Sequence, residues 1–199
     1  MPTNGDDNLI VYHADTLQQL HDGQILTLRP ARTPIRHLYP KGVSSYGERA
    51  FLKPENQEQA TMQAIDIMFD YVRCLYFPDK PSRFTSVFAS ASLEDSRAWL
   101  ERIVQDSDTG IDDLNAPSNH NIFAVEPSRI YIADARFLDC ENVLQGNPPA
   151  LSNILPFALA YWDSVQEIHT ELSDSMRRSY QKPELLLVPP VRVLRQIEP

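Results

Sequence analysis

The chain of 199 residues is poor in glycine, in cysteine and in long apolar runs, and each shortage excludes a class of protein. Six glycines against sixteen prolines indicate rigid, defined loops rather than flexible linkers. The two cysteines, Cys74 and Cys140, cannot form a disulfide framework, and we expect both to be reduced and buried. The longest apolar runs, such as residues 185–188, are far shorter than the roughly 20 residues that cross a bilayer.

Common catalytic and binding motifs are missing as well. The sequence contains no G-x-G pair, no G-x-x-x-x-G-K-[ST] loop, no H-E-x-x-H and no G-x-S-x-G. The five histidines lack the short spacing typical of metal ligands, so we expect no metal site. His120 and Cys140 could be paired as base and nucleophile, but nearly any chain with two cysteines offers such a pair.

Basic residues are in the minority, with 18 lysines and arginines against 27 acids and a net charge of -9. This balance excludes a general nucleic-acid coat, because phosphate binding requires a basic surface. Residues 29–53 are the exception, with six lysines and arginines and the single acid Glu48. A solvated loop and a surface for phosphate-bearing ligands both remain open for this segment.

The length and the composition, 42% hydrophobic and 23% charged, are those of an ordinary globular protein. We expect one domain at residues 9–199 behind a flexible N-terminus at residues 1–8. Because that N-terminus is polar and acidic rather than a secretory signal, we expect the protein in the cytoplasm, without a membrane partner.

Hydrophobic periodicity and punctuation by proline predict helices and short strands in mixed order. A helical repeat covers residues 55–77, a second helix opens at the capping serine Ser92, and a third begins near Leu155 and extends toward Leu172. The predicted strands are residues 9–13, 24–28, 83–90, 121–126, 130–133, 184–188 and 191–197. Residues 106–118 form an acidic loop that does not fit the calcium-binding EF-hand register. This order predicts an α+β fold with a split, mostly antiparallel β-sheet core and flanking helices.

Several short segments share their order along the chain with a known family. They are Tyr12-His13-Ala14-Asp15, Ser45-Tyr46-Gly47, residues 87–94 (VFASASLE), residues 122–127 (IFAVEP) and residues 190–194 (PVRVL). In this order they resemble the histidine-type branch of the ADP-ribosyltransferase superfamily, and within it the small rifampin ADP-ribosyltransferases. The run FPDKPSR at residues 77–83 is similar to an uncharacterised bacterial domain family with the same fold. Two positions depart from the pattern, since Ala14 replaces a glycine and Phe88 replaces a tyrosine.

The resemblance implies roles for particular side chains in the cleavage of NAD. Glu184 would stabilise the oxocarbenium-like transition state, and His13 would hold a ribose hydroxyl. Phe88 would stack on the nicotinamide ring, and Arg83 or Arg49 would bind the pyrophosphate. The remaining implied NAD contacts are Ala14, Tyr46, Ser86 and Ser90. On residue type alone, these positions are equally consistent with a surface glutamate, a strand histidine and a core aromatic.

The resemblance implies an NAD-dependent mono-ADP-ribosyltransferase, a glycosyltransferase that needs no metal. It would release nicotinamide and transfer ADP-ribose to RNA or to a protein. By family analogy, a small bacterial enzyme of this kind would be a toxin of a toxin–antitoxin pair or an antiviral defence effector, neutralised by an antitoxin protein. An NAD glycohydrolase remains an alternative, because the same residues would serve it. A non-catalytic interaction protein on a decayed fold is the other, and Ala14 and Phe88 favour it.

Overall fold

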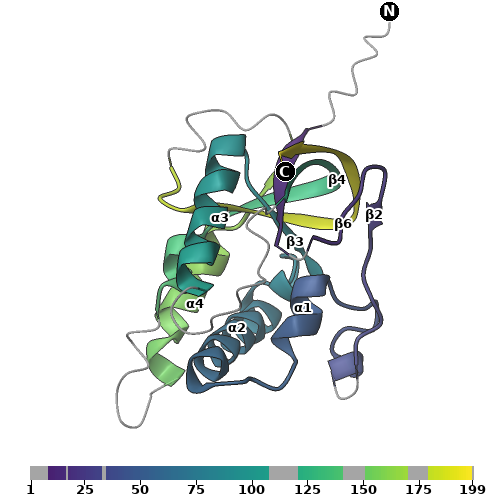
Figure 1. The fold of residues 1–199 in the computed structure, drawn as a ribbon. Coiled ribbons are helices and arrows are strands. Elements are labelled where there is room, and N and C mark those ends of the chain that lie inside the picture. Colours follow the sequence, from purple (N-terminus) through teal and green to yellow (C-terminus); the bar gives the residue numbers. More distant parts are fainter. Residues whose placement is uncertain are drawn as a thin grey trace, which may run out of the picture.

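The fold combines four α-helices with an antiparallel sheet in the part of the chain described here. The computed structural model describes residues 9–16, 18–32, 35–107, 121–140, 151–169 and 179–198. In that part, each pair of neighbouring strands runs antiparallel. The predicted α+β class with an antiparallel sheet is therefore confirmed (Figure 1).

Two long strands form the centre of the sheet and the shorter strands flank them. The strands are β1 (Val11–Asp15), β2 (Ile25–Leu26), β3 (Val87–Ala89), β4 (Asn121–Asp134), β5 (Gln166–Ile168) and β6 (Pro183–Glu198). β4 and β6 pair along most of their length. At its two ends β4 also pairs with β1 and with β5, whereas β6 pairs with β3 and with β2.

A pair of backbone hydrogen bonds curls this sheet so that β1 meets the end of β3. The amide of Tyr12 donates to the carbonyl of Ser90 at 2.9 Å, and the amide of Ser90 donates back at 2.8 Å. β1 is thus held by β4 on one side and by this bridge on the other. The curl brings His13 beside Phe88, two residues that are far apart in the sequence.

The described helices are α1 (Ser45–Ala50), α2 (Gln57–Tyr76), α3 (Leu93–Ser107) and α4 (Leu155–Ser164). Three of the four described helices begin at a capping side chain, whereas α4 has none and carries Pro156 in its first turn. The Asn56 side chain accepts from the amide of Gln59 at 2.8 Å, and Ser92 Oγ accepts from the amide of Asp95 at 3.1 Å. These side chains satisfy amides that the first turn leaves unpaired, so the predicted starts of α2 and α3 are close to the observed ones.

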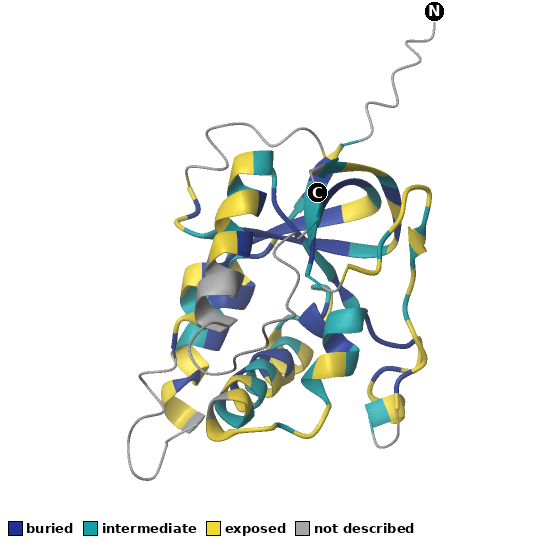
Figure 2. Cartoon of the chain, in the orientation of Figure 1, coloured by how far each residue is buried: buried dark blue, intermediate teal, exposed yellow. Residues whose placement is uncertain are grey.

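Alternate residues of β6 face two separate cores. Leu185 and Leu187 belong to a cluster built from the strands, and Leu186 packs in a second cluster with α2 and α4. The Trp162 indole of α4 donates to the carbonyl of Phe69 in α2 at 2.6 Å and joins the two helices. The buried stripes of these helices and of the sheet are visible in Figure 2.

The observed strand limits correct several predictions. Residues 121–126 and 130–133 form the single strand β4, and the two predicted C-terminal strands form the single strand β6. The prolines at 189 and 190 are tolerated because they lie opposite a register shift between Pro127 and Arg129, where the ladder is already interrupted. Within the predicted strand at 83–90, residues 87–89 form β3 and residues 83–85 form a 3₁₀ turn.

Three further expectations are wrong. α4 ends at Ser164, because Val165 is extended and the chain then enters β5, so the helix does not continue toward Leu172. His13 lies in the middle of β1 rather than at its end. Cys74 is exposed, since it lies off the buried face of α2, whereas Cys140 is buried as predicted; both are free thiols.

Some predictions fall on other parts of the chain. The N-terminus at residues 1–8, nearly all of the acidic loop at 106–118, and His120 lie outside the described residues. Within the described ranges, none of the helices combines the length and the apolar character that a membrane crossing requires.

Candidate functional site

The His13 imidazole is half-buried on β1 and bonded to the neighbouring strand. Its Nδ1 lies 2.7 Å from the carbonyl oxygen of Phe88. A carbonyl can only accept, so Nδ1 carries the proton and Nε2 of the neutral ring is an acceptor. Burial lowers the pKa of His13 and the Arg49 charge lowers it further, against the raising effects of the Phe88 bond and of Asp15. His13 is therefore suited to accept a hydrogen bond at neutral pH.

The Phe88 ring lies in an aromatic and cationic cluster next to this histidine. Its centroid is 4.8 Å from that of Tyr46 on α1, in an edge-to-face arrangement. The guanidinium carbon of Arg83 is also 4.8 Å from the Phe88 centroid, within the range of a cation–π contact. β3 therefore supplies the carbonyl that orients His13 and the ring that contacts Tyr46 and Arg83.

Arg83 connects this cluster to Glu184 at the start of β6. Its Nη1 donates to Glu184 Oε1 and, at 3.1 Å, to the hydroxyl of Tyr161 on α4. Tyr161 itself donates to the same Oε1 at 2.5 Å, so neither of these contacts uses Glu184 Oε2. Arg83 and Glu184 are both buried. Burial opposes the charge on Arg83, but Glu184 and the nearby phenols outweigh it and keep the pKa of the guanidinium well above its ordinary value.

Asp66 on α2 is a member of the site that the sequence analysis did not single out. It accepts a hydrogen bond from the Tyr46 hydroxyl, and its Oδ1 lies 3.7 Å from Nε of Arg83. Burial raises the pKa of Asp66, and Arg83 and the Tyr46 bond oppose that shift. The sequence feature that could have pointed to Asp66 is its position directly after Ile65, which lies on the apolar face of the predicted helix. The guanidinium thus lies between two carboxylates, Asp66 and Glu184.

The other residues that were predicted to contact NAD differ in their exposure to solvent. Arg49 is exposed on α1, and its charge acts on His13. Ala14 follows His13 on β1, and Ser90 is buried at the bridge to that strand. Ser86 is fully buried, and its hydroxyl donates to the Ser82 carbonyl at 2.8 Å. The structure therefore brings His13, Tyr46, Arg83, Phe88 and Glu184 into one connected network, with the remaining four positions outside these contacts.

No family model matches the chain, and no curated protein matches it either. The functional argument therefore rests on the side chains. Among the described residues, no three His, Cys, Asp or Glu side chains are grouped closely enough to hold a metal ion. What the network offers is a neutral imidazole acceptor, an aromatic pair and a carboxylate fixed through one of its two oxygens. These groups suit the binding of a polar ligand with an aromatic ring and a developing positive charge.

Proposed function

We propose that this chain is an NAD-dependent mono-ADP-ribosyltransferase with an ADP-ribosyltransferase-like fold. The supporting observation is that His13, Phe88 and Glu184, from three separate strands, belong to one network: His13 bonds to the Phe88 carbonyl, and Arg83 joins the Phe88 ring to Glu184. If Glu184 were only a surface glutamate and Phe88 only a core aromatic, we would not expect the two to share a buried arginine. The acceptor is a macromolecule, either a nucleic acid or a protein.

In the proposed reaction, the bond between ribose C1′ and the nicotinamide nitrogen breaks and its electron pair leaves with nicotinamide. Positive charge then develops on the ribose, as in glycoside cleavage. Glu184 would stabilise this charge and accept a hydrogen bond from a ribose hydroxyl through Oε2, because Oε1 is occupied by Arg83 and Tyr161. A nucleophilic atom of the acceptor forms the new bond to C1′ and loses its proton.

The neighbouring groups would position NAD for this step. His13 would accept a hydrogen bond from a ribose hydroxyl through Nε2, and the Phe88 and Tyr46 rings would contact the nicotinamide ring. Arg49 is the better candidate for the pyrophosphate, because it is exposed whereas the Arg83 guanidinium is committed to two carboxylates. Arg83 would instead orient Glu184. A ribose contact from Ser86 would require its hydroxyl to leave the Ser82 carbonyl.

The decisive experiment measures nicotinamide release from NAD by the wild type and by Glu184→Gln. Glutamine retains an oxygen for Arg83 and Tyr161 but lacks the charge, so we expect the rate to fall about 100-fold or more. Glu167→Gln is the control for the same change of charge, since Glu167 is paired with Arg129 at a partly exposed position on β5. An inactive wild type, or a Glu184→Gln variant as active as the wild type, would refute the proposal. Melting temperatures confirm that each variant is folded.

Two alternatives give different results in the same assays. Labelled NAD incubated with cell lysate leaves label on a macromolecule if the protein is a transferase, and yields only free ADP-ribose if it is an NAD glycohydrolase. The burial of the Arg83–Glu184 pair favours a third function, a non-catalytic interaction protein in which the pair is purely structural. That protein would release no nicotinamide, and Glu184→Gln would change its stability alone.

A further inference from the structure

Residues 29–32 and 35–43, named here the basic loop, are closed at their base by a bridge between Arg29 and Val43. The amide of Arg29 donates to the Val43 carbonyl at 2.7 Å, and the amide of Val43 donates back at 2.8 Å. Gly42 makes this approach possible, because it has a φ of +102° and a Cβ there would lie 2.3 Å from the Arg29 carbonyl oxygen. The ends of the loop are therefore held together.

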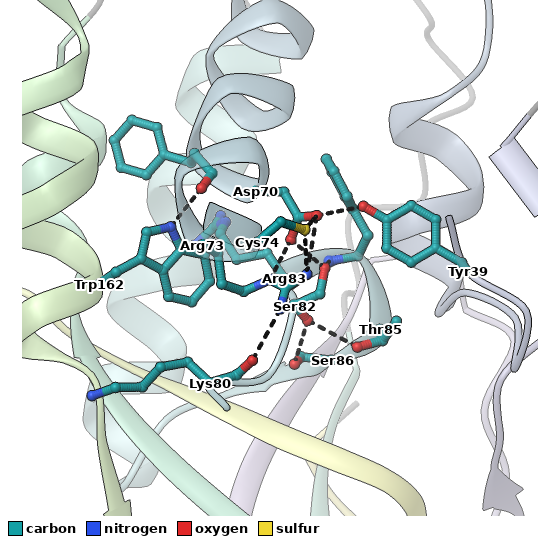
Figure 3. Close-up of polar contacts among 12 residues, drawn as sticks. Tyr39, Asp70, Arg73, Cys74, Lys80, Ser82, Arg83, Thr85, Ser86 and Trp162 are labelled. Atoms are coloured by element: carbon teal, nitrogen blue, oxygen red, sulfur yellow. Dashed lines mark hydrogen bonds and ion pairs between the residues drawn. The ribbon is translucent and has the colours of Figure 1, made fainter. Parts of the chain in front are cut away.

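A second attachment fixes the middle of the basic loop to α2. Tyr39 is buried, and its hydroxyl donates to Asp70 Oδ2 at 2.5 Å. Asp70 also accepts from Ser82 Oγ at 2.6 Å and from Arg73 Nε at 2.8 Å, as Figure 3 shows. A buried carboxylate with several donors is a strong anchor, because breaking one bond would leave buried polar groups unpaired. The loop is thus a defined surface.

That surface is basic and exposed. Arg29 and Arg32 have 54% and 67% of their side chains exposed, and both contact Glu48 at 3.2 and 3.3 Å. The other exposed basic residues of the segment are Arg36, His37, Lys41, Arg49 and Lys53. Residues 29–53 carry six lysines and arginines against one acid, a formal charge of +5, in a chain whose net charge is -9. The rest of the sequence is therefore acidic, and the positive charge is concentrated here.

We propose that the basic loop is a docking surface for the phosphate backbone of a single-stranded nucleic acid. This inference rests on the proposed transferase function, for which the bound strand is the acceptor. Arginine predominates in the segment, and its guanidinium matches phosphate oxygens. At physiological ionic strength, charges more than about 8 Å away are largely screened, so the local cations outweigh the distant acids.

The position of Arg49 connects this surface to the candidate site. Arg49 follows the basic loop on α1, the helix whose Tyr46 contacts Phe88 of the site and packs in one cluster with Tyr39 and Val43 of the loop. Because α1 joins the loop to Phe88 through Tyr46, a flexible single strand bound along the loop would extend toward the candidate site. A rigid duplex could not bend a base or a strand end toward ribose C1′ as readily.

Binding to fluorescein-labelled 12-nucleotide RNA and DNA strands, followed by anisotropy without NAD, tests the surface directly. We expect wild-type affinity to fall as salt rises from about 50 to 200 mM. Arg36→Glu and Lys41→Glu should each weaken binding about fivefold near 0.1 M salt, the counterion-release value of one phosphate contact, and should lower the salt slope. Arg97→Glu, an equal charge change at an exposed position on α3, should leave binding unchanged.

The outcomes separate this inference from the proposed enzyme activity. The docking surface is refuted if the strands do not bind, if Arg97→Glu weakens binding as much as Arg36→Glu, or if polyglutamate binds as well as RNA. Strand binding that depends on Arg36, without nicotinamide release from NAD, supports the surface and refutes the transferase. Stronger binding of RNA than of DNA identifies RNA as the acceptor class, and equal binding supports a backbone-only contact.

Discussion

At the scale of single residues, Arg83 determines how the candidate site is organised. Its guanidinium is buried, contacts Asp66 and Glu184, and lies over the ring of Phe88. Within the described part of the chain its Nε has no hydrogen-bond partner, because Asp66 is 3.7 Å away. An arginine in this environment costs free energy of desolvation, which only its charged partners offset.

Removing one member of this buried pair should therefore destabilise the fold strongly. We expect Arg83→Met to lower the free energy of unfolding by about 3–5 kcal/mol, because Glu184 stays buried without its counter-charge. Adding Glu184→Leu to Arg83→Met should recover much of this loss. Urea unfolding of the single and double variants measures both values, and a double variant less stable than Arg83→Met would contradict the assigned pairing.

His13 gives the stability a characteristic dependence on pH. Burial holds its pKa in the folded state below the ordinary value of 6.5. As the pH falls through 6.5, the unfolded chain takes up a proton at His13 and the folded chain does not, so the free energy of unfolding decreases. The decrease ends once the pH reaches the lowered pKa of the folded state.

His13→Gln should remove this contribution and flatten the stability curve on the acid side of pH 6.5. The wild-type protein, unfolded at the same pH values, is the reference for this curve. Denaturant unfolding at a series of pH values measures the slope. Identical slopes for His13→Gln and the wild type would show that the imidazole is not buried as described.

At the scale of elements, α2 serves both the candidate site and the basic loop. Asp66 and Asp70 lie four residues apart on this helix, and the first holds Tyr46 while the second holds Tyr39. On the same helix, Ile65, Phe69 and Val72 are buried in the core. The helix thereby couples the core to both polar networks.

The base of the basic loop offers a prediction at this scale. Gly42→Ala should cost about 3 kcal/mol or more, because its Cβ would collide with the Arg29 carbonyl in a left-handed conformation. Gly23 also has a positive φ of +77°, but open space surrounds its Cβ position, so Gly23→Ala should cost only about 1–2 kcal/mol. Thermal unfolding compares the two variants, and equal losses would contradict the tight bridge.

At the scale of the whole molecule, the sheet separates a core built from the strands from a core that α2 and α4 pack against. Trp162 is fully buried where α4 meets α2, and Trp99 on α3 is partly exposed beside Lys182. Trp162→Ala should therefore lower the free energy of unfolding by about 3–5 kcal/mol, and Trp99→Ala by clearly less. Calorimetry decides this, and a larger loss for Trp99→Ala would show that α3, not the α2–α4 contact, dominates stability.

The sequence alone determined the elements whose signals are local. The helical repeat at residues 55–77, the capping serine Ser92, and the alternation of strands and helices predicted α2, the start of α3 and the α+β class. These features depend on side chains within a few residues of one another, so a short stretch of sequence contains the cause.

Only the tertiary structure decided which distant side chains meet. The bridge between Tyr12 and Ser90, the position of Arg83 between Asp66 and Glu184, and the end of α4 at Ser164 all follow from strand register and packing. Register is set by contacts across the whole sheet, and one step of slippage would turn every side chain to the other face. No local pattern carries that information, which is why the contact between Asp66 and Arg83 escaped prediction.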